Sequence, residues 1–262
     1  MSRQRPLICG NWKLHHSVAQ SRLAIKQLQT HLQSTPIQVA IAPVAVALES
    51  SCRMAKSKHT TPIDIAAQNV FHAPQGAFTG EWSVQHLREL GCTFALVGHS
   101  ERRQLFGESD ALVARKVEAC LQKGITPIAC IGESSQQHQQ GEAHIVLKKQ
   151  LTSMLQPLSS RLASRLVIAY EPVWAIGTGQ AAQPQQIQDT LAFVRLLIQR
   201  LQGPHVAQQV RLLYGGSVSK NNAYAFMQQP HIDGLLVGGA SLHAHTFIQV
   251  IQQAHKGWLA AK

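Results

Sequence analysis

The sequence has few aromatic residues and no long apolar run. Phe, Trp and Tyr make up 5% of the 262 residues, and they are not interleaved with Lys and Arg as on surfaces that stack nucleic-acid bases. No run reaches the ~18 apolar residues of a membrane span, and the apolar stretch near the N-terminus is too short for the core of a signal peptide. We therefore expect no membrane association, and the composition argues against nucleic-acid binding.

Cysteine is sparse and odd in number. The five cysteines contain no C-x-x-C pair, and such a set indicates neither a disulfide framework nor a zinc site. We therefore expect no metal ion in the protein, and a reducing cytoplasm fits this cysteine usage best.

Acidic residues are also scarce. The sequence has 13 Asp and Glu but 24 Lys and Arg, which gives a formal net charge of +11. The basic residues are spread over predicted helices rather than concentrated in one run. Two interpretations therefore remain open: a basic surface without a partner, or a positive mouth that attracts a small anionic substrate.

Eight short apolar runs recur along the chain, and longer segments with helical spacing separate them. Continuous rather than alternating apolar character is typical of parallel strands buried on both faces. Helical spacing is clear over residues 111–123 and 184–202. The alternation predicts an α/β fold, and eight similar units favour a closed (β/α)8 barrel over an open doubly wound sheet. We expect residues 1–262 to form a single domain. The runs are PLICG, IQVAIAP, IDIAAQN, FALVGHS, ITPIACIGE, LVIAYEP, VRLLYGG and GLLVGG.

Polar residues and glycines gather at the carboxyl ends of five of these predicted strands. Barrel active sites are built at that end, so these side chains are expected to meet at one mouth. A Lys, a His and a Glu at a common point can transfer protons without a metal, and glycine-rich turns offer backbone N–H groups to an anion. The residues are Asn11, Trp12 and Lys13; Gly98, His99, Ser100 and Glu101; Glu171 and Pro172; Gly215, Gly216 and Ser217; Gly238 and Gly239.

Each of these residues alone has an ordinary structural interpretation. A carboxylate such as Glu171 at a strand end commonly caps a helix or forms an ion pair. His99 is one of 14 histidines, a single Lys13 could be a solvated amine, and glycines are needed wherever φ is positive. Taken together, these structural interpretations are less convincing. They would require a base, an electrophile, a cation and phosphate-binding turns to lie at the same end of the strands by chance.

An ordered set of motifs resembles the triosephosphate isomerase family. The match runs through GNWK at residues 10–13, QN at 68–69, GAFTGEWS at 76–83, GHSERR at 98–103, FGESD at 106–110, CIGE at 130–133, AYEPVWAIGTG at 169–179, YGGSV at 214–218 and DGLLVGGASL at 233–242. No single block decides the matter, but their order covers essentially the whole chain.

The resemblance implies an enzyme that interconverts dihydroxyacetone phosphate and glyceraldehyde 3-phosphate without a cofactor. It assigns Glu171 as the catalytic base and a neutral His99 as the electrophile, with Ser100 expected to cap the following helix. Asn11 and Lys13 contact the substrate, and Glu101 orients Lys13. The phosphate binders implied are Gly177, Ser217, Gly238 and Gly239.

Two segments are expected to complete the site. Residues 172–179 read as a lid, because Pro172 fixes one edge, glycines permit bending, and an exposed apolar tip around Trp174 would need something to cover. Residues 68–82 are long for a strand-to-helix connection of ~2–6 residues. In the family, this loop reaches the other subunit of a homodimer, which implies that Thr79 lies near Asn11 and Glu101 of the partner subunit.

Departures from the family pattern lie off the chemistry: Leu14, His15 and His16 after Lys13, Val44 in place of a common Pro, and Gln180 after the lid. Two rival functions remain. A different phosphate-binding barrel enzyme would not need the combination of Lys13, His99 and Glu171. A non-catalytic polyanion or nucleic-acid-binding protein on the same scaffold would explain the net positive charge, but it would not explain the combination of Lys13, His99 and Glu171.

Overall fold

The centre of the molecule is a closed sheet of eight parallel strands. The computed structural model describes residues 4–32, 35–56, 62–175 and 182–261. Each strand pairs with the next in sequence order, and β1 also pairs with β8, where Leu7 lies opposite Gly234. Each predicted apolar run contains one strand, so the expected (β/α)8 barrel is confirmed. The strands are β1 (Leu7–Asn11), β2 (Gln38–Ala42), β3 (Asp64–Ala67), β4 (Phe94–Val97), β5 (Thr126–Ile131), β6 (Val167–Tyr170), β7 (Arg211–Tyr214) and β8 (Gly234–Val237).

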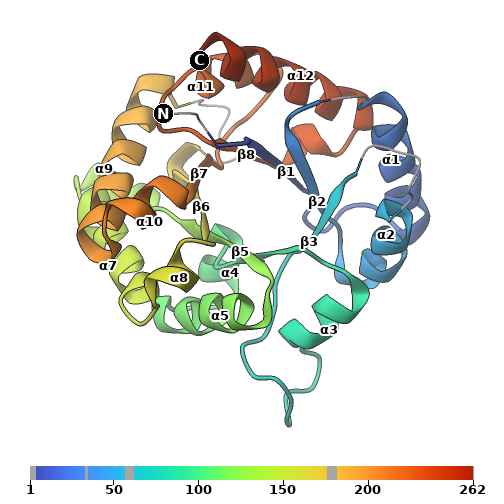
Figure 1. Cartoon of the computed structure of the whole chain (residues 1–262), viewed down its shortest axis with the longest axis horizontal. Coiled ribbons are helices and arrows are strands. Elements are labelled where there is room, and N and C mark those ends of the chain that lie inside the picture. Colours follow the sequence, from blue (N-terminus) through green and yellow to red (C-terminus); the bar gives the residue numbers. More distant parts are fainter. Residues whose placement is uncertain (1–3, 33–34, 57–61, 176–181, 262) are drawn as a thin grey trace.

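Helices follow the strands and form a ring around the barrel (Figure 1). They are α1 (Val18–His31), α2 (Leu48–Ala55), α3 (Val84–Leu90), α4 (Ser100–Leu105), α5 (Asp110–Lys123), α6 (Ser135–Gln139), α7 (Ala143–Leu155), α8 (Ser160–Ala163), α9 (Pro184–Gln202), α10 (Pro204–Gln209), α11 (Ala223–Met227) and α12 (Ala244–Ala260), with short 3-10 turns η1 (Ala45–Ala47), η2 (Val173–Ala175) and η3 (Gly239–Ser241). Among the helices of the described ranges, none is long and apolar enough to cross a membrane.

Local sequence explains where the predicted helices begin and end. The helix α9 starts at Pro184, whose missing N–H is harmless in the first turn, and it ends before Gly203. The helix α5 starts one residue earlier than the apolar pattern indicates, because the side chain of Ser109 accepts a hydrogen bond from the N–H of Leu112. The glutamine-rich stretch after β5 forms the short helix α6, and a capping box with Ser134 begins it.

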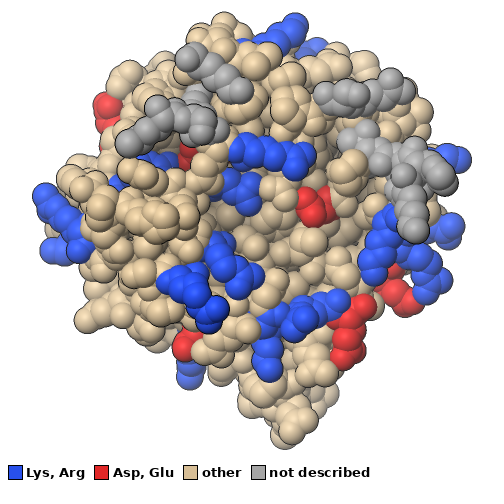
Figure 2. Space-filling view, in the orientation of Figure 1, with Lys and Arg blue, Asp and Glu red and all other residues tan. Residues whose placement is uncertain are grey.

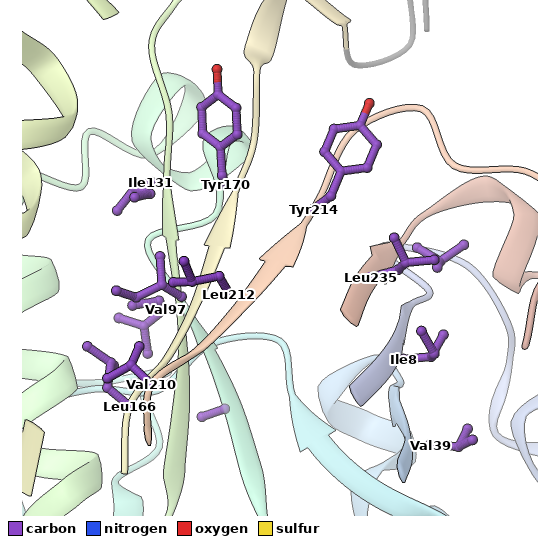
Figure 3. Packing of buried hydrophobic residues seen from close by; sticks show 14 of the residues in the cluster. Ile8, Val39, Val97, Ile131, Leu166, Tyr170, Val210, Leu212, Tyr214 and Leu235 are labelled. Carbon is purple, nitrogen blue, oxygen red and sulfur yellow. The ribbon is translucent and has the colours of Figure 1, made fainter. Parts of the chain in front are cut away.

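Two hydrophobic cores result from the alternation of side chains along each strand. Residues such as Leu7, Cys9 and Ala40 fill the interior of the barrel. Their strand neighbours Ile8 and Val39 belong to the second core, which packs strands against the helical ring (Figure 3). Because both faces of every strand are buried, the continuous apolar runs of the sequence follow directly from this architecture.

Candidate active site

A cavity of about 260 Å³ lies at the carboxyl ends of the strands. It is smaller than the ~300–1,000 Å³ typical of drug-sized ligand pockets, so it suits a small molecule. Most residues that the sequence singles out line it: Asn11 and Lys13 after β1, His99 after β4, Glu171 after β6, Ser217 after β7, and Gly238 and Gly239 after β8. Glu101 lines an adjoining cavity that shares Asn11, Lys13 and His99. Gly177 lies outside the described residues.

Glu171 is a buried carboxylate with partners on both of its oxygens. Its residue is 2% exposed. One carboxylate oxygen accepts a hydrogen bond of 2.9 Å from the backbone N–H of Ser100, and the other lies 3.1 Å from Nε2 of His99. Burial and the nearby charge of Glu171 raise the pKa of the Cys130 thiol. Glu171 lines both the main cavity and a second one of about 210 Å³ beside it, so its carboxylate stands at the boundary between them.

The backbone around His99 determines which ring nitrogen carries the proton. His99 precedes α4 as its N-cap, and its Nδ1 accepts a hydrogen bond of 3.2 Å from the N–H of Glu101. A nitrogen that accepts a hydrogen bond carries no proton, so a neutral ring holds its proton on Nε2, the atom that faces Glu171. The expectation that Ser100 caps this helix is wrong. Ser100 is the first helical residue, because His99 already fills the cap position and Glu171 takes the N–H of Ser100.

Hydrogen bonds to its backbone and side chain hold Lys13 in an unfavourable backbone conformation. Its φ is 51°, in the left-handed region, which costs a residue with a side chain ~1–3 kcal/mol. The N–H of Lys13 donates to Oδ1 of Asn11 at 3.0 Å, and Nε2 of Gln68 donates to its carbonyl oxygen at 2.7 Å. Nζ of Lys13 donates to Oε1 of Glu101 at 2.6 Å. These contacts direct the ammonium group to the cavity.

The charge of Glu101 maintains the pair with Lys13. Burial disfavours the ionised form of Glu101 and raises its pKa. The hydrogen bond from Lys13 and the positive charge of Lys13 outweigh burial, so the pKa of Glu101 is lowered from 4.5. At neutral pH the carboxylate is therefore ionised and forms an ion pair with Nζ of Lys13.

Sequence reasoning gives Glu133 no role, yet this residue supports both flanks of Glu171. Its carboxylate accepts hydrogen bonds from the hydroxyl of Tyr170 at 3.0 Å and from Nε1 of Trp174 at 2.8 Å. Nδ1 of His138 lies 3.3 Å from the same carboxylate, and its ring stacks on Trp174. A polar residue that ends the fifth apolar run is the signal that could have indicated Glu133.

The first part of the predicted lid is anchored rather than exposed. Trp174 lies in η2, half-buried, with its indole N–H bound to Glu133. The expectation that Trp174 is part of an exposed apolar tip is therefore wrong, because its indole N–H donates a hydrogen bond to a buried carboxylate. The rest of the predicted lid, residues 176–179, lies outside the described part of the chain.

The backbone before Glu133 approaches the catalytic strand very closely. A Cβ atom added at Gly132 would lie 1.9 Å from the carbonyl oxygen of Glu171, whereas real Cβ atoms keep ordinary contact distances. Only glycine therefore lets the end of β5 pack against the end of β6 and bring Glu133 beside Tyr170.

A buried ion network lies beneath the site. Oε1 of Glu108 accepts hydrogen bonds from Nζ of Lys116 at 2.6 Å and from Nε of Arg102 at 2.5 Å. Lys116 also donates to Oδ1 of Asn69 at 2.8 Å. Because Arg102 follows Glu101 on α4 and Asn69 follows Gln68 after β3, the network connects the two segments that position Lys13.

Glu108→Gln is expected to lower the free energy of unfolding by about 3–5 kcal/mol at pH ~7, because it leaves Lys116 buried without its counter-charge. Burial raises the pKa of Glu108, but hydrogen bonds from Lys116 and Arg102 outweigh it, so this pKa is lowered from 4.5. A lowered native pKa stabilises the fold above the unfolded value, and this stabilisation disappears as pH falls through the native value. Urea unfolding should therefore show a constant difference from the unsubstituted chain down to pH ~4, and a difference that shrinks as the pH falls further.

The matched control for this prediction is Glu49→Gln, which removes a carboxylate from an exposed ion pair with Arg53. Such pairs contribute ~0–1 kcal/mol. An equally small loss in both variants would contradict the stabilising role of the Glu108 network.

Comparison with known proteins agrees with the geometry of the site. The sequence profile of the family described as Triosephosphate isomerase matches residues 6–254. The triosephosphate isomerase of Syntrophotalea carbinolica is 43% identical over 250 residues, which cover 95% of this chain and 98% of that protein. The triosephosphate isomerase of Clostridium acetobutylicum is 42% identical over 94% of this chain and 98% of its own length. The triosephosphate isomerase of Rhodopirellula baltica is 41% identical over 97% and 99%.

These matches extend over nearly the full length of both partners, and they include every strand and every described residue that lines the cavity. The chain belongs to the triosephosphate isomerase family.

Proposed function

We propose that this protein interconverts dihydroxyacetone phosphate and glyceraldehyde 3-phosphate through an enediolate, with Glu171 as the base and His99 as the electrophile. One observation carries the assignment of roles: a buried carboxylate lies 3.1 Å from Nε2 of a histidine whose Nδ1 is occupied by a backbone N–H. A base and a hydrogen-bond donor so close together are what proton transfer next to a carbonyl requires.

In the proposed mechanism Glu171 removes a proton from the carbon beside the carbonyl and returns it to the neighbouring carbon. The Nε2–H of His99 donates to the carbonyl oxygen as negative charge develops there. In this structure the same donor faces Glu171, so the substrate must replace that contact when it binds. The neutral state of His99 is inherited from the family, which is itself the established example of a neutral histidine electrophile.

The other end of the cavity supplies groups for a phosphate. The first N–H groups of a helical turn have no partner within the turn, so the start of η3 at Gly239 presents donors to an anion. Gly238 and Ser217 line the same cavity. A Cβ atom added at Gly238 would lie 3.6 Å from Cε of Lys13, so the ammonium side chain lies next to this turn. We propose that Lys13 serves both the phosphate and the developing oxyanion.

The function is tested by conversion of glyceraldehyde 3-phosphate by the purified full chain, with a chelator present and no cofactor added. Fast conversion is the expected result. If the folded protein gave no conversion, the proposal would fail, and a non-catalytic polyanion-binding function would become the better explanation. Lys and Arg side chains at the centre and the rim of the face in Figure 2 would then be the surface to examine.

We also propose that two copies of the chain associate through residues 68–82. This segment projects beyond the helical ring between β3 and α3 (Figure 1), and Thr79 in it is exposed. Beside the active site, a cavity of about 260 Å³ is bordered by Leu14 and Phe106, which are 92% and 66% exposed. Exposed apolar side chains around a cavity are typical of a surface that another protein covers.

Thr79→Arg is expected to convert the dimer to a monomer and to lower kcat/KM at least ~10-fold. In the proposed dimer, the bulky cation would enter the cavity of the other copy and be repelled by the Lys13 and Arg102 side chains that line such a cavity. Light scattering and the isomerase assay measure the two effects. Thr30→Arg, an exposed change of the same charge on α1, is the matched control. A fully active monomer would refute the proposal that dimerisation completes the site.

We propose in addition that the chain acts as a single domain in the cytoplasm. All five cysteines are buried free thiols. Unpaired thiols are typical of a reducing compartment, which supports this location.

A further inference from the structure

Two cysteines from different elements of the helical layer are in direct contact. Sγ of Cys52, on α2, lies 3.7 Å from Sγ of Cys92, which follows α3. The two residues are 40 positions apart in the sequence and are both buried. Sulfurs at this distance are already neighbours, and a bond of ~2.05 Å between them requires the side chains to move closer.

The surroundings of the pair make Cys52 more acidic than an ordinary cysteine. The hydrogen bond from Cys92 lowers the pKa of Cys52, and the positive charge of Lys56 lowers it further against the opposing effect of burial. The same hydrogen bond raises the pKa of Cys92. Lys56 is exposed, and its Nζ lies 2.7 Å from the position of a Cβ atom on Gly91, so the ammonium group lies over the residue next to Cys92.

The remaining thiols have a different environment. Burial raises the pKa of Cys9 to about 12 and that of Cys120 to about 12, and it raises the pKa of Cys130 as well. Thiols rather than thiolates are poor nucleophiles, so these three cysteines are inert toward oxidants. Among the five cysteines, only Cys52 has a lowered pKa, and Cys92 is the thiol in contact with it.

We propose that Cys52 and Cys92 are an oxidative modification site, at which a peroxide converts the two thiols to a reversible intramolecular disulfide. The thiolate of Cys52 attacks the O–O bond of the peroxide and becomes a sulfenic acid, and for hydrogen peroxide the other oxygen leaves as water after taking up a proton. Cys92 then attacks the sulfur of the sulfenic acid, and its proton leaves with the hydroxyl as a second water. Two thiols lose two electrons, and one hydrogen peroxide is reduced to two waters.

A small peroxide is the class of oxidant that fits the burial of the pair. Cys52 and Cys92 are 2% and 5% exposed, so a bulky disulfide such as oxidised glutathione cannot approach either sulfur in the native fold. A peroxide needs only a local opening beside Lys56.

The bond would join the outer helical layer without touching the active site. Cys92 lies two residues before β4 begins, whereas His99 follows the opposite end of that strand. Isomerase activity is therefore expected to stay within ~2-fold of the reduced protein. The bridge would close a long loop in the unfolded chain, which should raise Tm by on the order of 10 °C.

The test treats the purified full chain with hydrogen peroxide and measures three quantities: free thiols after denaturation, proteolytic peptides by mass spectrometry, and Tm. We expect the loss of two thiols, a cross-linked peptide pair that contains Cys52 and Cys92, and a Tm rise that dithiothreitol reverses. Cys52→Ser and Cys92→Ser should each lose all three effects. Cys120→Ser, which removes a buried thiol outside the pair, should keep them.

Several results would overturn the inference. These are an unchanged thiol count and Tm, oxidation of Cys52 to a sulfinic acid without a cross-linked peptide, or a cross-link that involves Cys9, Cys120 or Cys130. If either serine variant failed to fold, the peptide analysis of the unsubstituted chain would still decide between these outcomes. The activity of the same samples is measured separately, so a failure of the proposed isomerase function is distinguishable from a failure of the disulfide.

Discussion

Glu171→Gln is expected to lower kcat by at least ~10²–10⁴-fold, the range that a positioned general base contributes. The amide has nearly the same shape as the carboxylate, and its oxygen can still accept the hydrogen bond that Ser100 donates to Glu171 at 2.9 Å. It cannot take up a proton at neutral pH. The substitution therefore removes the base while leaving the cavity, so KM should change little. Steady-state assays in both directions of the isomerisation measure this.

Two companion variants make this result specific to Glu171. Glu171→Asp withdraws the carboxylate by about one methylene and should lower kcat on the order of 10²-fold if geometry governs the proton transfer. Glu89→Gln makes the same chemical change on an exposed residue of α3 and should leave kcat unaltered. A Glu171→Gln protein that kept more than about a tenth of the activity would rule out this residue as the base.

Lys13→Met is expected to lower kcat/KM by about 10²–10³-fold, the effect of removing one positioned group that stabilises developing negative charge. The ammonium group lies in the cavity because Glu101 holds it at 2.6 Å and because Asn11 and Gln68 maintain the left-handed backbone at Lys13. Methionine has similar length without the charge. The assay should therefore show a loss in kcat as well as a rise in KM.

The control for Lys13→Met is Lys148→Met, which removes the same charge from an exposed position on α7. If the basic surface acts only by long-range attraction, both variants should lose a similar, salt-dependent part of kcat/KM. That outcome would contradict a positioned role for Lys13. A large loss of kcat/KM in Lys13→Met alone, at every ionic strength tested, would support the positioned role.

The fold could be predicted from the sequence because each strand is buried on two sides. Continuous runs such as IQVAIAP at residues 37–43 therefore indicate strands without ambiguity about faces. The start of α4 could not be predicted in this way. His99 takes the cap position of this helix, and the N–H of Ser100 is bound instead by Glu171, a residue 71 positions away. Local propensity has no access to a contact of that range.

The candidate site was predictable to the extent that its residues end strands. Lys13, His99 and Glu171 stand directly after apolar runs, and the barrel brings those ends together. Glu133 and Gln68 also end strands, but their roles come from contacts with Trp174 and Lys13 that no spacing indicates. The partners of Glu108 lie 6 and 8 residues away on two different helices, and Glu108 itself lies in the connection between them, so no helical repeat indicates these contacts. Such networks require coordinates.

The closure of the barrel also sets a condition on how the chain folds during synthesis. The last pairing joins Leu7 to Gly234, so β1 keeps an unpaired edge until β8 has left the ribosome. At ~5–20 residues per second, this interval lasts roughly 10–45 seconds. An open edge of parallel strand is a template for pairing with other nascent chains. The order of the strands along the chain therefore determines how long this edge stays open to other chains during synthesis, because the strand that covers β1 is the last of the eight to be made.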